Sequence, residues 1–437
     1  MLEKIKGIIL DSQDFSVDTG VPRQLNIESI PGKATICMGV RRCGKSTYML
    51  QLIEQLLAKG TSTENILYIN FFDDRLCNLT EENLHLVLEA YYSLFPEKKN
   101  AETVYCFFDE IQVVRGWESF VGRILRTERC EVYITGSSSR MLSKEIASAM
   151  RGRSLSWELF PFSFEEFLDY KNIHWQEHIS TKRRLLIQNA FEEYLQCGGF
   201  PEVAGLSSRL RVKIHQEYLH AVLFRDLIER HDISHPKAVL DLAHRLTDNT
   251  ASLYSLNKLY GFLQSQGHKA PKHSVADYLN WFEDSYFFFT VRLFDASLSR
   301  SNANPKKIYC IDHAMVTSTA SGILVNSGHL LENLIFIAIR RVTEPVFYYR
   351  TKNSLEVDFI LQMPDHSRKL IQVSESLQNP VTKKREVKAL TTAMKEQNLT
   401  TGTIVTRNDT GTIETEAGVI QVVPAWKFLL EMRIERG

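Results

Sequence analysis

Short apolar runs alternate with amphipathic stretches through the first third of the chain. A run of four to eight apolar residues is typical of a strand buried on both faces, so these runs predict buried strands. They span 33–38, 65–72, 103–111 and 131–138. Between them, apolar residues recur at helical spacing behind Lys45 and again from Trp117 to about Arg129. This alternation predicts an α/β fold, a parallel sheet with helices on both faces and a ligand site at the carboxyl ends of its strands.

The middle of the chain has a different pattern. From Phe164 to about Arg230 the apolar spacing is helical, and short helices are predicted at 239–246, 255–265 and 274–283. A hairpin-like pair, 286–294 with 307–311, follows across a polar loop at 299–305. That order resembles a winged helix. The predicted recognition helix holds His273, Asp277 and Tyr278 but few cations, so a lid or scaffold and a DNA reader both remain open.

The last third begins near Asn326 with a helix at 328–339. Strands are predicted at 346–350, 356–361 and 370–374, then a basic helix at 382–396 and a strand at 402–406. The sequence therefore predicts a helical and winged-helix-like domain and then a further α/β domain behind the first sheet. The expected boundaries are 1–165, 166–325 and 326–437.

Length and charge narrow the functional classes. A chain of 437 residues is too long for one hydrophobic core. Its formal net charge is zero, so contact with nucleic acid must be local. The seven cysteines include no C-x-x-C pair, which argues against disulfides and zinc. The N-terminus lacks the apolar core of a signal peptide, and the most apolar runs are too short to span a bilayer. We expect a cytoplasmic protein with no membrane contact.

A phosphate-binding loop follows the first predicted strand. Gly39, Gly44, Lys45 and Ser46 fit the pattern G-x-x-x-x-G-K-[ST]. Glycines let consecutive backbone N–H groups face phosphate oxygens, and the helix that starts near Lys45 adds its positive dipole end. Lys45 is expected to reach the β- and γ-phosphates, and the Ser46 hydroxyl to bind Mg²⁺. The residues expected to surround ATP are Gly39, Val40, Arg41, Arg42, Cys43, Gly44, Lys45, Ser46 and Thr47.

Two carboxylates end the third predicted strand. Asp109 is expected beside the phosphate loop, where the Mg²⁺ shell needs an acceptor, and Glu110 is the candidate base that orients the attacking water. Ser137 and Ser138 end the next strand. They could contact the γ-phosphate or the attacking water, or cap the following helix.

These motifs together resemble a prokaryotic branch of AAA+ ATPases. The resemblance rests on the phosphate loop, the two carboxylates and four further segments: 135–138, 150–153, 159–167 and 194–202. It implies ATP binding and hydrolysis, the additional-strand class of P-loop folds, and often an assembly in which a neighbour's arginine reaches the γ-phosphate. Arg151 and Arg153 are the candidates; surface pairing with Glu158 or Glu165 is the alternative.

The C-terminal order of helix, three strands, helix and strand resembles the PD-(D/E)XK nuclease core. In that family an Asp and an E-x-K pair hold Mg²⁺ and activate water, often with a glutamate from the first helix. Asp358 and Glu332 match, with Glu356 as a further helper, but the E-x-K positions read Gln372 and Ser374. Arg385 and Glu386 are candidate replacements. We expect a degenerate domain that binds DNA or protein rather than a working nuclease.

The densest basic stretch of the chain lies on the predicted helix at 382–396. It contains Lys383, Lys384, Arg385 and Lys388, which could grip phosphates or form a solvated face. The resulting expectation is an ATPase that acts on or binds DNA, as a homo-oligomer or with a protein partner. The alternative is a slow nucleotide-gated switch whose last domain is a docking surface.

Overall fold

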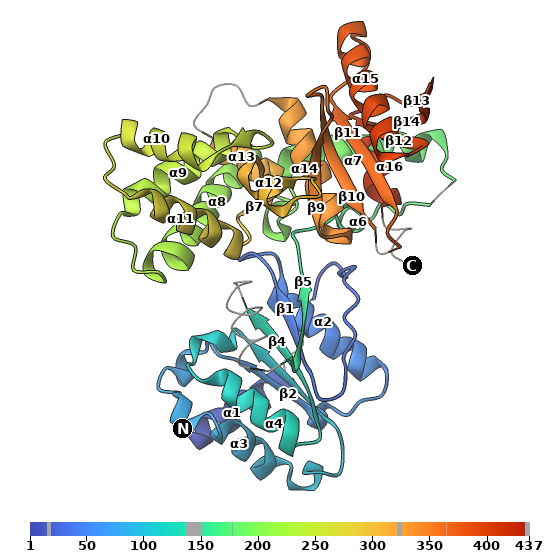
Figure 1. Ribbon diagram of the computed structural model, residues 1–437. Coiled ribbons are helices and arrows are strands. Elements are labelled where there is room, and N and C mark those ends of the chain that lie inside the picture. Colours follow the sequence, from blue (N-terminus) through green and yellow to red (C-terminus); the bar gives the residue numbers. More distant parts are fainter. Residues whose placement is uncertain are drawn as a thin grey trace. The chain divides into compact units, whose positions relative to one another are not determined.

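The computed structural model consists of two compact units, Met1–Phe160 and Pro161–Gly437 (Figure 1). It describes residues 1–14, 19–136, 150, 152–176, 178–320, 326–363 and 365–432.

A five-stranded sheet, parallel throughout, forms the centre of the first unit, with strand order β2-β3-β4-β1-β5. Its strands are β1 (Ala34–Met38), β2 (Ile66–Asn70), β3 (Val104–Asp109), β4 (Cys130–Gly136) and β5 (Ser154–Glu158). The first four are the predicted strands. Because β4 lies between β1 and β3, the sheet has the additional strand that the AAA+ resemblance implies.

Helices cover both faces of this sheet, as predicted. They are α1 (Leu2–Asp14), α2 (Lys45–Ala58), α3 (Leu86–Leu94) and α4 (Trp117–Thr127). Short 3₁₀ turns lie at Thr63–Asn65, Asp74–Leu76, Glu81–Asn83, Pro96–Lys98 and Ile111–Val113. Parallel crossovers are right-handed, and the chain reverses its direction across the sheet after β2, so α2 lies on one face and α3 and α4 on the other. In α4, Trp117, Phe120, Val121 and Ile124 are buried at the spacing of one helical stripe.

The second unit begins with helices. They are α6 (Phe164–Tyr170), α7 (Thr181–Cys197), α8 (Ser208–Ala221), α9 (Pro236–Asp248), α10 (Leu256–Ser265), α11 (Lys272–Asp284), α12 (Leu298–Ala303) and α13 (His313–Thr319), with a 3₁₀ turn at Pro201–Val203 and a π-helix at Val222–Glu229. The prediction of a polar loop at 299–305 is wrong. Those residues contain most of α12, because Ser297 accepts a hydrogen bond from the backbone N–H of Arg300 and caps the helix.

A nine-stranded mixed sheet runs through the rest of this unit in the order β13-β14-β12-β11-β10-β9-β7-β8-β6. Its strands are β6 (Leu253–Tyr254), β7 (Phe288–Leu293), β8 (Lys306–Cys310), β9 (Val346–Arg350), β10 (Glu356–Gln362), β11 (Arg368–Ser374), β12 (Thr401–Thr406), β13 (Gly411–Thr415) and β14 (Gly418–Pro424). β7 forms the predicted antiparallel pair with β8, and it also pairs in parallel with β9. The middle and C-terminal regions therefore share one sheet.

Three helices accompany the C-terminal strands: α14 (Ser327–Val342), α15 (Pro380–Gln397) and α16 (Ala425–Glu431). The predicted order of helix, three strands, helix and strand is confirmed. α15 contributes Leu390, Ala393 and Met394 to a buried cluster with residues of β10, β12 and β14. Gly402 lies under this helix, where an added Cβ would come within 3.0 Å of Leu390 and Met394 side-chain atoms.

The start of the second unit is anchored by residues far along the chain. The Phe162 N–H donates to the Gly199 carbonyl at 2.5 Å, and the Phe162 carbonyl accepts from the Tyr194 hydroxyl at 2.7 Å and from Arg341 at 3.1 Å. A Cβ on Gly199 would lie 2.5 Å from the Phe162 carbonyl oxygen, so this close approach requires glycine. The turn at 198–199 thus fixes the position of the residues that follow Phe160 and begin the second unit.

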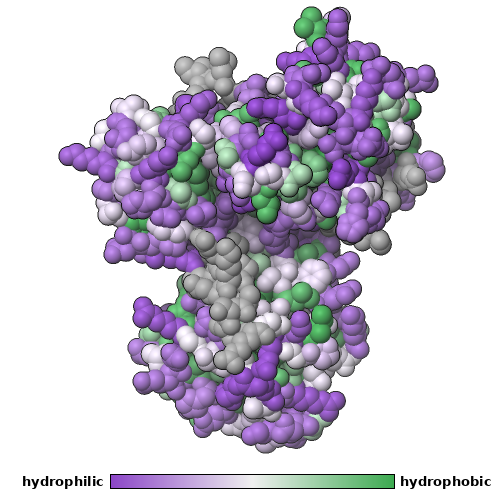
Figure 2. All heavy atoms as spheres, in the orientation of Figure 1, coloured by the Kyte–Doolittle hydropathy of each residue, from purple (hydrophilic) through white to green (hydrophobic). Residues whose placement is uncertain are grey.

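Hydrophilic side chains cover most of the visible surface of each unit, and hydrophobic ones form small separate groups (Figure 2). Among the residues that the structure describes, no helix combines the length and the apolar character needed to cross a bilayer.

Candidate functional site

The phosphate loop joins β1 to α2 in the predicted way. Gly44 adopts φ +99° and immediately precedes Lys45, the first residue of α2. Gly39 also has a positive φ, and a Cβ there would lie 2.1 Å from the Leu159 carbonyl oxygen. Both loop glycines are therefore required by the backbone, and the loop delivers the chain directly into a helix N-terminus.

Lys45 is only 5% exposed, and its ammonium group faces the loop itself. Nζ donates to the carbonyl oxygens of Gly39 and Val40, at 3.0 Å each. Among the described residues, no carboxylate is found in an ion pair with Lys45. Ser46 and Thr47, in the first turn of α2, are exposed. The loop thus combines a cation held only by neutral carbonyls with two accessible hydroxyls.

Arg23 holds the backbone of the phosphate loop in place, a role that the sequence did not indicate. Its guanidinium donates to the Cys43 carbonyl at 2.7 Å and to the Phe160 carbonyl at 2.6 Å. Cys43 is buried, Arg41 half-buried and Arg42 exposed with φ +65°. The loop backbone is thereby tied to the residue at which the first unit ends.

Asp109 is fully buried at the carboxyl end of β3. Its Oδ1 accepts a short hydrogen bond from the Thr135 hydroxyl, and its Oδ2 accepts one from the Tyr68 hydroxyl at 3.1 Å. Burial and the neighbouring Asp109 together raise the pKa of Tyr68 well above its ordinary value, so that hydroxyl stays a donor. Thr135 belongs to β4, where Ile134 pairs with Phe108 of β3, so the sheet register places it beside Asp109.

Glu110 follows in a left-handed conformation, φ +56°, that turns the chain out of the strand. Its N–H donates to the Thr135 hydroxyl at 2.9 Å. Its carboxylate accepts a short hydrogen bond from the side-chain amide of Gln112, and the Gln112 carbonyl oxygen is buried without a partner. Thr135 therefore fixes both acidic residues, and Gln112 holds the second one. Thr135 lies inside the predicted strand 131–138 and Gln112 directly after the predicted strand 103–111, but their contacts require the folded sheet.

Three other predicted residues, Ser137, Ser138 and Arg151, lie outside the described residues. Arg153 is described and exposed. Its carbonyl accepts from the Ala34 N–H at 2.8 Å, at the amino end of β1. Because the phosphate loop leaves the carboxyl end of the same five-residue strand, Arg153 lies roughly 15 Å along the strand direction from its own loop.

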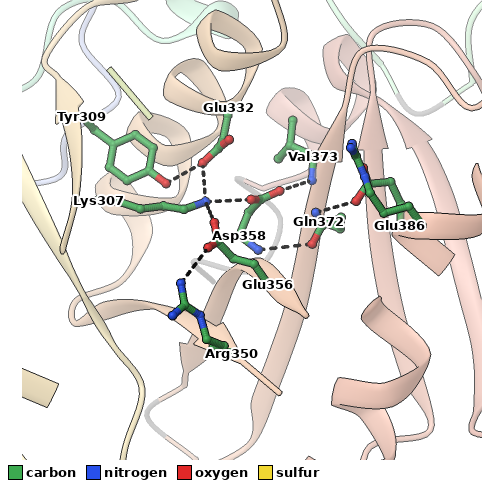
Figure 3. A network of polar contacts seen from close by, with 10 residues as sticks. Lys307, Tyr309, Glu332, Arg350, Glu356, Asp358, Gln372, Val373 and Glu386 are labelled. Atoms are coloured by element: carbon green, nitrogen blue, oxygen red, sulfur yellow. Dashed lines mark hydrogen bonds and ion pairs between the residues drawn. The ribbon is translucent and has the colours of Figure 1, made fainter. Parts of the chain in front are cut away.

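A second polar cluster lies in the C-terminal region; we call Lys307, Tyr309, Glu332, Glu356 and Asp358 the Lys307 centre (Figure 3). The Lys307 ammonium, on β8, lies 2.8 Å from Asp358, 2.9 Å from Glu356 and 3.0 Å from Glu332. The Tyr309 hydroxyl donates to Glu332 at 2.7 Å. The pairing of β10 with β9 shifts register between Val357 and Ile360, a bulge of the kind that re-aims a side chain.

The structure brings together Asp358, Glu332 and Glu356, as the nuclease resemblance implied. Gln372 borders the cluster: its carbonyl accepts from the Asp358 N–H at 3.2 Å and its amide donates to Glu386 at 2.8 Å. The Ser374 hydroxyl instead donates to the Ser376 carbonyl at 3.3 Å. The two candidate replacements, Arg385 and Glu386, pair with each other, and Glu386 is also the residue that contacts Gln372. Lys307 was not anticipated, since it lies before the predicted nuclease-like domain.

Burial dominates the electrostatics of the Lys307 centre. It raises the pKa of Glu332 to about 7, helped by Asp358 and opposed by Lys307. Burial by itself would lower the pKa of Lys307, but Asp358 and Glu332 outweigh it and hold that pKa above its ordinary value. The ammonium is therefore charged at neutral pH.

Two predicted nucleic-acid contacts have different surroundings. On α15, the side chains of Lys383, Lys384, Arg385 and Lys388 are exposed. On α11, His273 and Asp277 are exposed, but Tyr278 is buried and serves the core. The basic face of α15 is thus the more accessible of the two.

Comparison with protein families assigns each region. A family model described as an AAA domain matches residues 31–168. Two models described as domains of unknown function, DUF8612 and DUF4143, match residues 188–323 and 327–428.

Two relatives resemble the chain over most of its length. An uncharacterized protein of Methanocaldococcus jannaschii, MJ1544, is 34% identical over 435 residues, 97% of this chain and 94% of the relative. An uncharacterized protein of Haemophilus influenzae is 27% identical over 332 residues, 76% of this chain and 80% of that one.

Among solved structures, the Walker-type ATPase of Pyrococcus abyssi matches with a TM-score of 0.45 and 14% identity, over 65% of this chain and 90% of that one. The ORC1 protein of Aeropyrum pernix, solved in complex with DNA, matches with a TM-score of 0.31 and 11% identity, over 73% and 90% of the two chains.

Proposed function

This chain belongs to the same family as the uncharacterized Methanocaldococcus jannaschii protein. We propose that it is an AAA-type ATPase that binds ATP with Mg²⁺ and hydrolyses the bond between the β- and γ-phosphates, giving ADP and phosphate. The observation that carries the proposal is the meeting of the phosphate loop with Asp109 and Glu110 at the carboxyl edge of one parallel sheet.

The residues of the loop suit a triphosphate. Lys45 is buried but bonded only to the Gly39 and Val40 carbonyls, so phosphate oxygens can replace neutral acceptors without breaking an ion pair. The first N–H groups of α2 follow Gly44, which has no side chain to cap them. The remaining loop residues, Arg41, Arg42, Cys43 and Thr47, complete the backbone cradle.

The residues for Mg²⁺ also fit. Ser46 offers an exposed hydroxyl, and Asp109 offers a carboxylate whose partners are hydroxyls of Thr135 and Tyr68 rather than cations. One hydroxyl and one carboxylate that acts through water are an ordinary protein contribution to Mg²⁺, which keeps most of its waters. When bound, the ion neutralises charge on the β- and γ-phosphates.

Glu110 is the proposed base that orients the attacking water. Thr135 fixes its backbone at the strand end, and Gln112 holds its carboxylate. ATP binding must then release Glu110 from Gln112 before the carboxylate can face a water on the γ-phosphate. We assign Ser137 and Ser138 to contacts near that phosphate, on the sequence order alone.

Arg153 suits a contribution from a neighbouring subunit. It is exposed and lies at the sheet edge opposite its own loop, so its guanidinium cannot reach its own γ-phosphate. Arg151 is the second candidate. If sites are shared, mixing Arg151→Ala/Arg153→Ala with Lys45→Ala should partly restore turnover, because each variant supplies what the other lacks. If the chain stays monomeric in every nucleotide state and mixing the variants does not restore turnover, the assignment of Arg151 and Arg153 to a neighbouring site is wrong.

We propose three functional modules, 1–165, 166–325 and 326–437. ATP turnover in the first module drives conformational change in the second and third. DNA is the proposed partner of the third, through the exposed basic face of α15. The second candidate function, a slow nucleotide-gated switch with a docking domain, is favoured by the Gln112 contact that keeps Glu110 engaged. Stimulation of ATP turnover by DNA separates the two.

The test of the ATPase proposal compares three variants of the full chain. Lys45→Ala should abolish tight ATP binding, whereas Lys59→Ala, at the exposed C-terminal end of α2, should leave it unchanged. Glu110→Gln should keep ATP affinity within about twofold and lower turnover ~10²- to 10⁴-fold, the usual range for a lost general base. Equal turnover by Glu110→Gln and wild type would show that Glu110 is not the base.

A further inference from the structure

We propose that the Lys307 ammonium is a built-in cation occupying the position in which the surrounding carboxylates would otherwise hold a divalent metal ion. In the native chain this centre needs no metal. Shortening the Lys307 side chain should convert it into a binding site for Mn²⁺ or Mg²⁺. This inference concerns the second unit and does not depend on the ATPase proposal.

The carboxylates of the Lys307 centre converge on a single cationic group. Carboxylates from two elements, Glu332 on α14 and Glu356 and Asp358 on β10, converge on one nitrogen atom at 2.8–3.0 Å (Figure 3). Carboxylate oxygens are the ligands that hard divalent cations prefer, at roughly 2.0–2.1 Å for Mg²⁺. A small contraction of these side chains, with water in the space that the lysine leaves, would give a mixed protein and water shell.

Two polar groups beside the centre have their partners within the chain. The second oxygen of Asp358 accepts from the Val373 N–H at 2.9 Å, and Gln372 uses both ends of its amide, on the Asp358 N–H and on Glu386. Among the described residues, no group of three or more His, Cys, Asp or Glu side chains is arranged to hold a metal ion. The carboxylates surround an ammonium, not an open position.

The charge balance favours a divalent ion once the lysine is removed. Three carboxylates face one ammonium, and Arg350 lies 3.6 Å from the far oxygen of Glu356. The Tyr309 hydroxyl lends one further donor to Glu332. Removing Lys307 takes away the ammonium that faces all three carboxylates and leaves the buried Asp358 carboxylate without its cationic partner, a strongly unfavourable state.

Lys307 also comes from a different region than its partners. It lies on β8, inside the region matched as 188–323, whereas all three carboxylates lie inside the region matched as 327–428. The built-in cation therefore joins the two regions electrostatically, beside the backbone pairing of β7 with β9.

A lysine among carboxylates also occurs in nuclease sites, where it acts on a phosphodiester. Here the Lys307 side chain is 3% exposed and those of Glu332 and Asp358 are 10% and 9% exposed. A phosphodiester has no access to the ammonium in this arrangement. The geometry therefore favours a counter-ion over a catalytic lysine.

The experiment uses the full chain without nucleotide and titrates Mn²⁺, with free ion followed by electron paramagnetic resonance. Lys307→Ala removes the charge and makes room; Lys307→Met removes the charge but fills the space, and serves as the matched control. We expect Lys307→Ala to bind one Mn²⁺ per chain at least ~10-fold more tightly than wild type or Lys307→Met. The double variant Lys307→Ala/Asp358→Asn should not bind this ion. The melting temperature of Lys307→Ala should rise with Mn²⁺, whereas that of Lys307→Met should not.

Two results would overturn the proposal. One is Mn²⁺ binding by wild type that Asp358→Asn abolishes, which would show that the native centre accepts a metal. The other is a Lys307→Ala chain that gains no Mn²⁺ affinity. If Lys307→Ala does not fold in chelator, refolding in Mn²⁺ becomes the readout, and failure of Mn²⁺ to restore the folded chain counts equally against the proposal.

Discussion

The phosphate loop and the Lys307 centre contain the same residue types in opposite arrangements. In the first unit, Lys45 bonds to two backbone carbonyls while Asp109 bonds to two hydroxyls, so cation and anion are each held by neutral partners. In the second unit, Lys307 is bonded directly to the carboxylates. Neutral partners can be exchanged for a charged ligand at low cost, whereas a buried ion pair cannot be opened without leaving a bare charge.

A lysine and an aspartate near a strand end therefore do not by themselves indicate a ligand site. What matters is whether the lysine already has its counter-ion. By that criterion the first unit suits the proposed binding of phosphate and Mg²⁺, whereas the lysine of the second unit is already paired with carboxylates. The following predictions alter one side of the comparison at a time.

The largest effect is expected from Gly39→Ala. The new Cβ would lie 2.1 Å from the Leu159 backbone oxygen, so the loop must move away from β5 and lose its cradle. We expect ATP affinity to fall at least ~100-fold, the change that corresponds to roughly 3 kcal/mol. Calorimetry of ATP binding measures it. Gly60→Ala, at a position with open space after α2, is the control, although its positive φ strains any side chain. ATP affinity that survives Gly39→Ala would show that the loop is not held as described.

A smaller effect is expected from Thr135→Val, which keeps the shape but removes the hydroxyl shared by Asp109 and Glu110. A hydrogen bond to a charged group contributes about 1.5–3 kcal/mol, so turnover should fall ~10- to 100-fold. KM for ATP should change little, because the loop is untouched. Thr135→Ser, which keeps the hydroxyl, should retain the turnover that Thr135→Val loses. Steady-state kinetics that show a changed KM and an unchanged kcat would mean that Thr135 acts on binding instead.

The smallest effect concerns the exposed face of α15. If this face binds DNA, Lys383→Ala/Lys384→Ala should weaken affinity ~10-fold near 0.1 M salt and reduce the slope of log K against log salt by about 1.8, the value for two lost phosphate contacts. Lys182→Ala/Lys427→Ala, at exposed positions of α7 and α16, is the control. An unchanged slope, or no DNA binding by wild type, would favour the docking alternative.

Local chemistry made the phosphate loop predictable. Gly39, Gly44, Lys45 and Ser46 act at fixed spacing on one continuous segment, and Asp109 ends an apolar strand, so both were found from sequence order. The register of β3 against β4 could not be predicted from sequence order. The contacts of Thr135 with Asp109 and Glu110 depend on that register, so only the structure shows them. Arg23 contacts residues 20 and 137 positions away, a relation that no periodicity reveals.

The second unit shows the same limit more strongly. The element order from α14 to β12 was predicted, and so was the approach of Glu332 to Asp358. The sequence separation of Lys307 from these partners is 25 and 51 residues, and Lys307 belongs to a strand predicted only as half of a hairpin. The candidate replacements that the sequence offers, Arg385 and Glu386, lie on α15 and pair with each other. Pairing of β7 with β9 brings β8 beside the carboxylates, and only the folded sheet shows it.

The most direct measurement counts Mn²⁺ bound per wild-type chain with and without a non-hydrolysable ATP analogue. Our account predicts no tightly bound ion without nucleotide and one ion per chain with it, and the nucleotide-dependent ion should disappear in Lys45→Ala. One ion bound without nucleotide and lost in Asp358→Asn would show that the Lys307 centre is open and contradict the comparison. Absence of any nucleotide-dependent ion would contradict the assignment of the first unit as the ATP site.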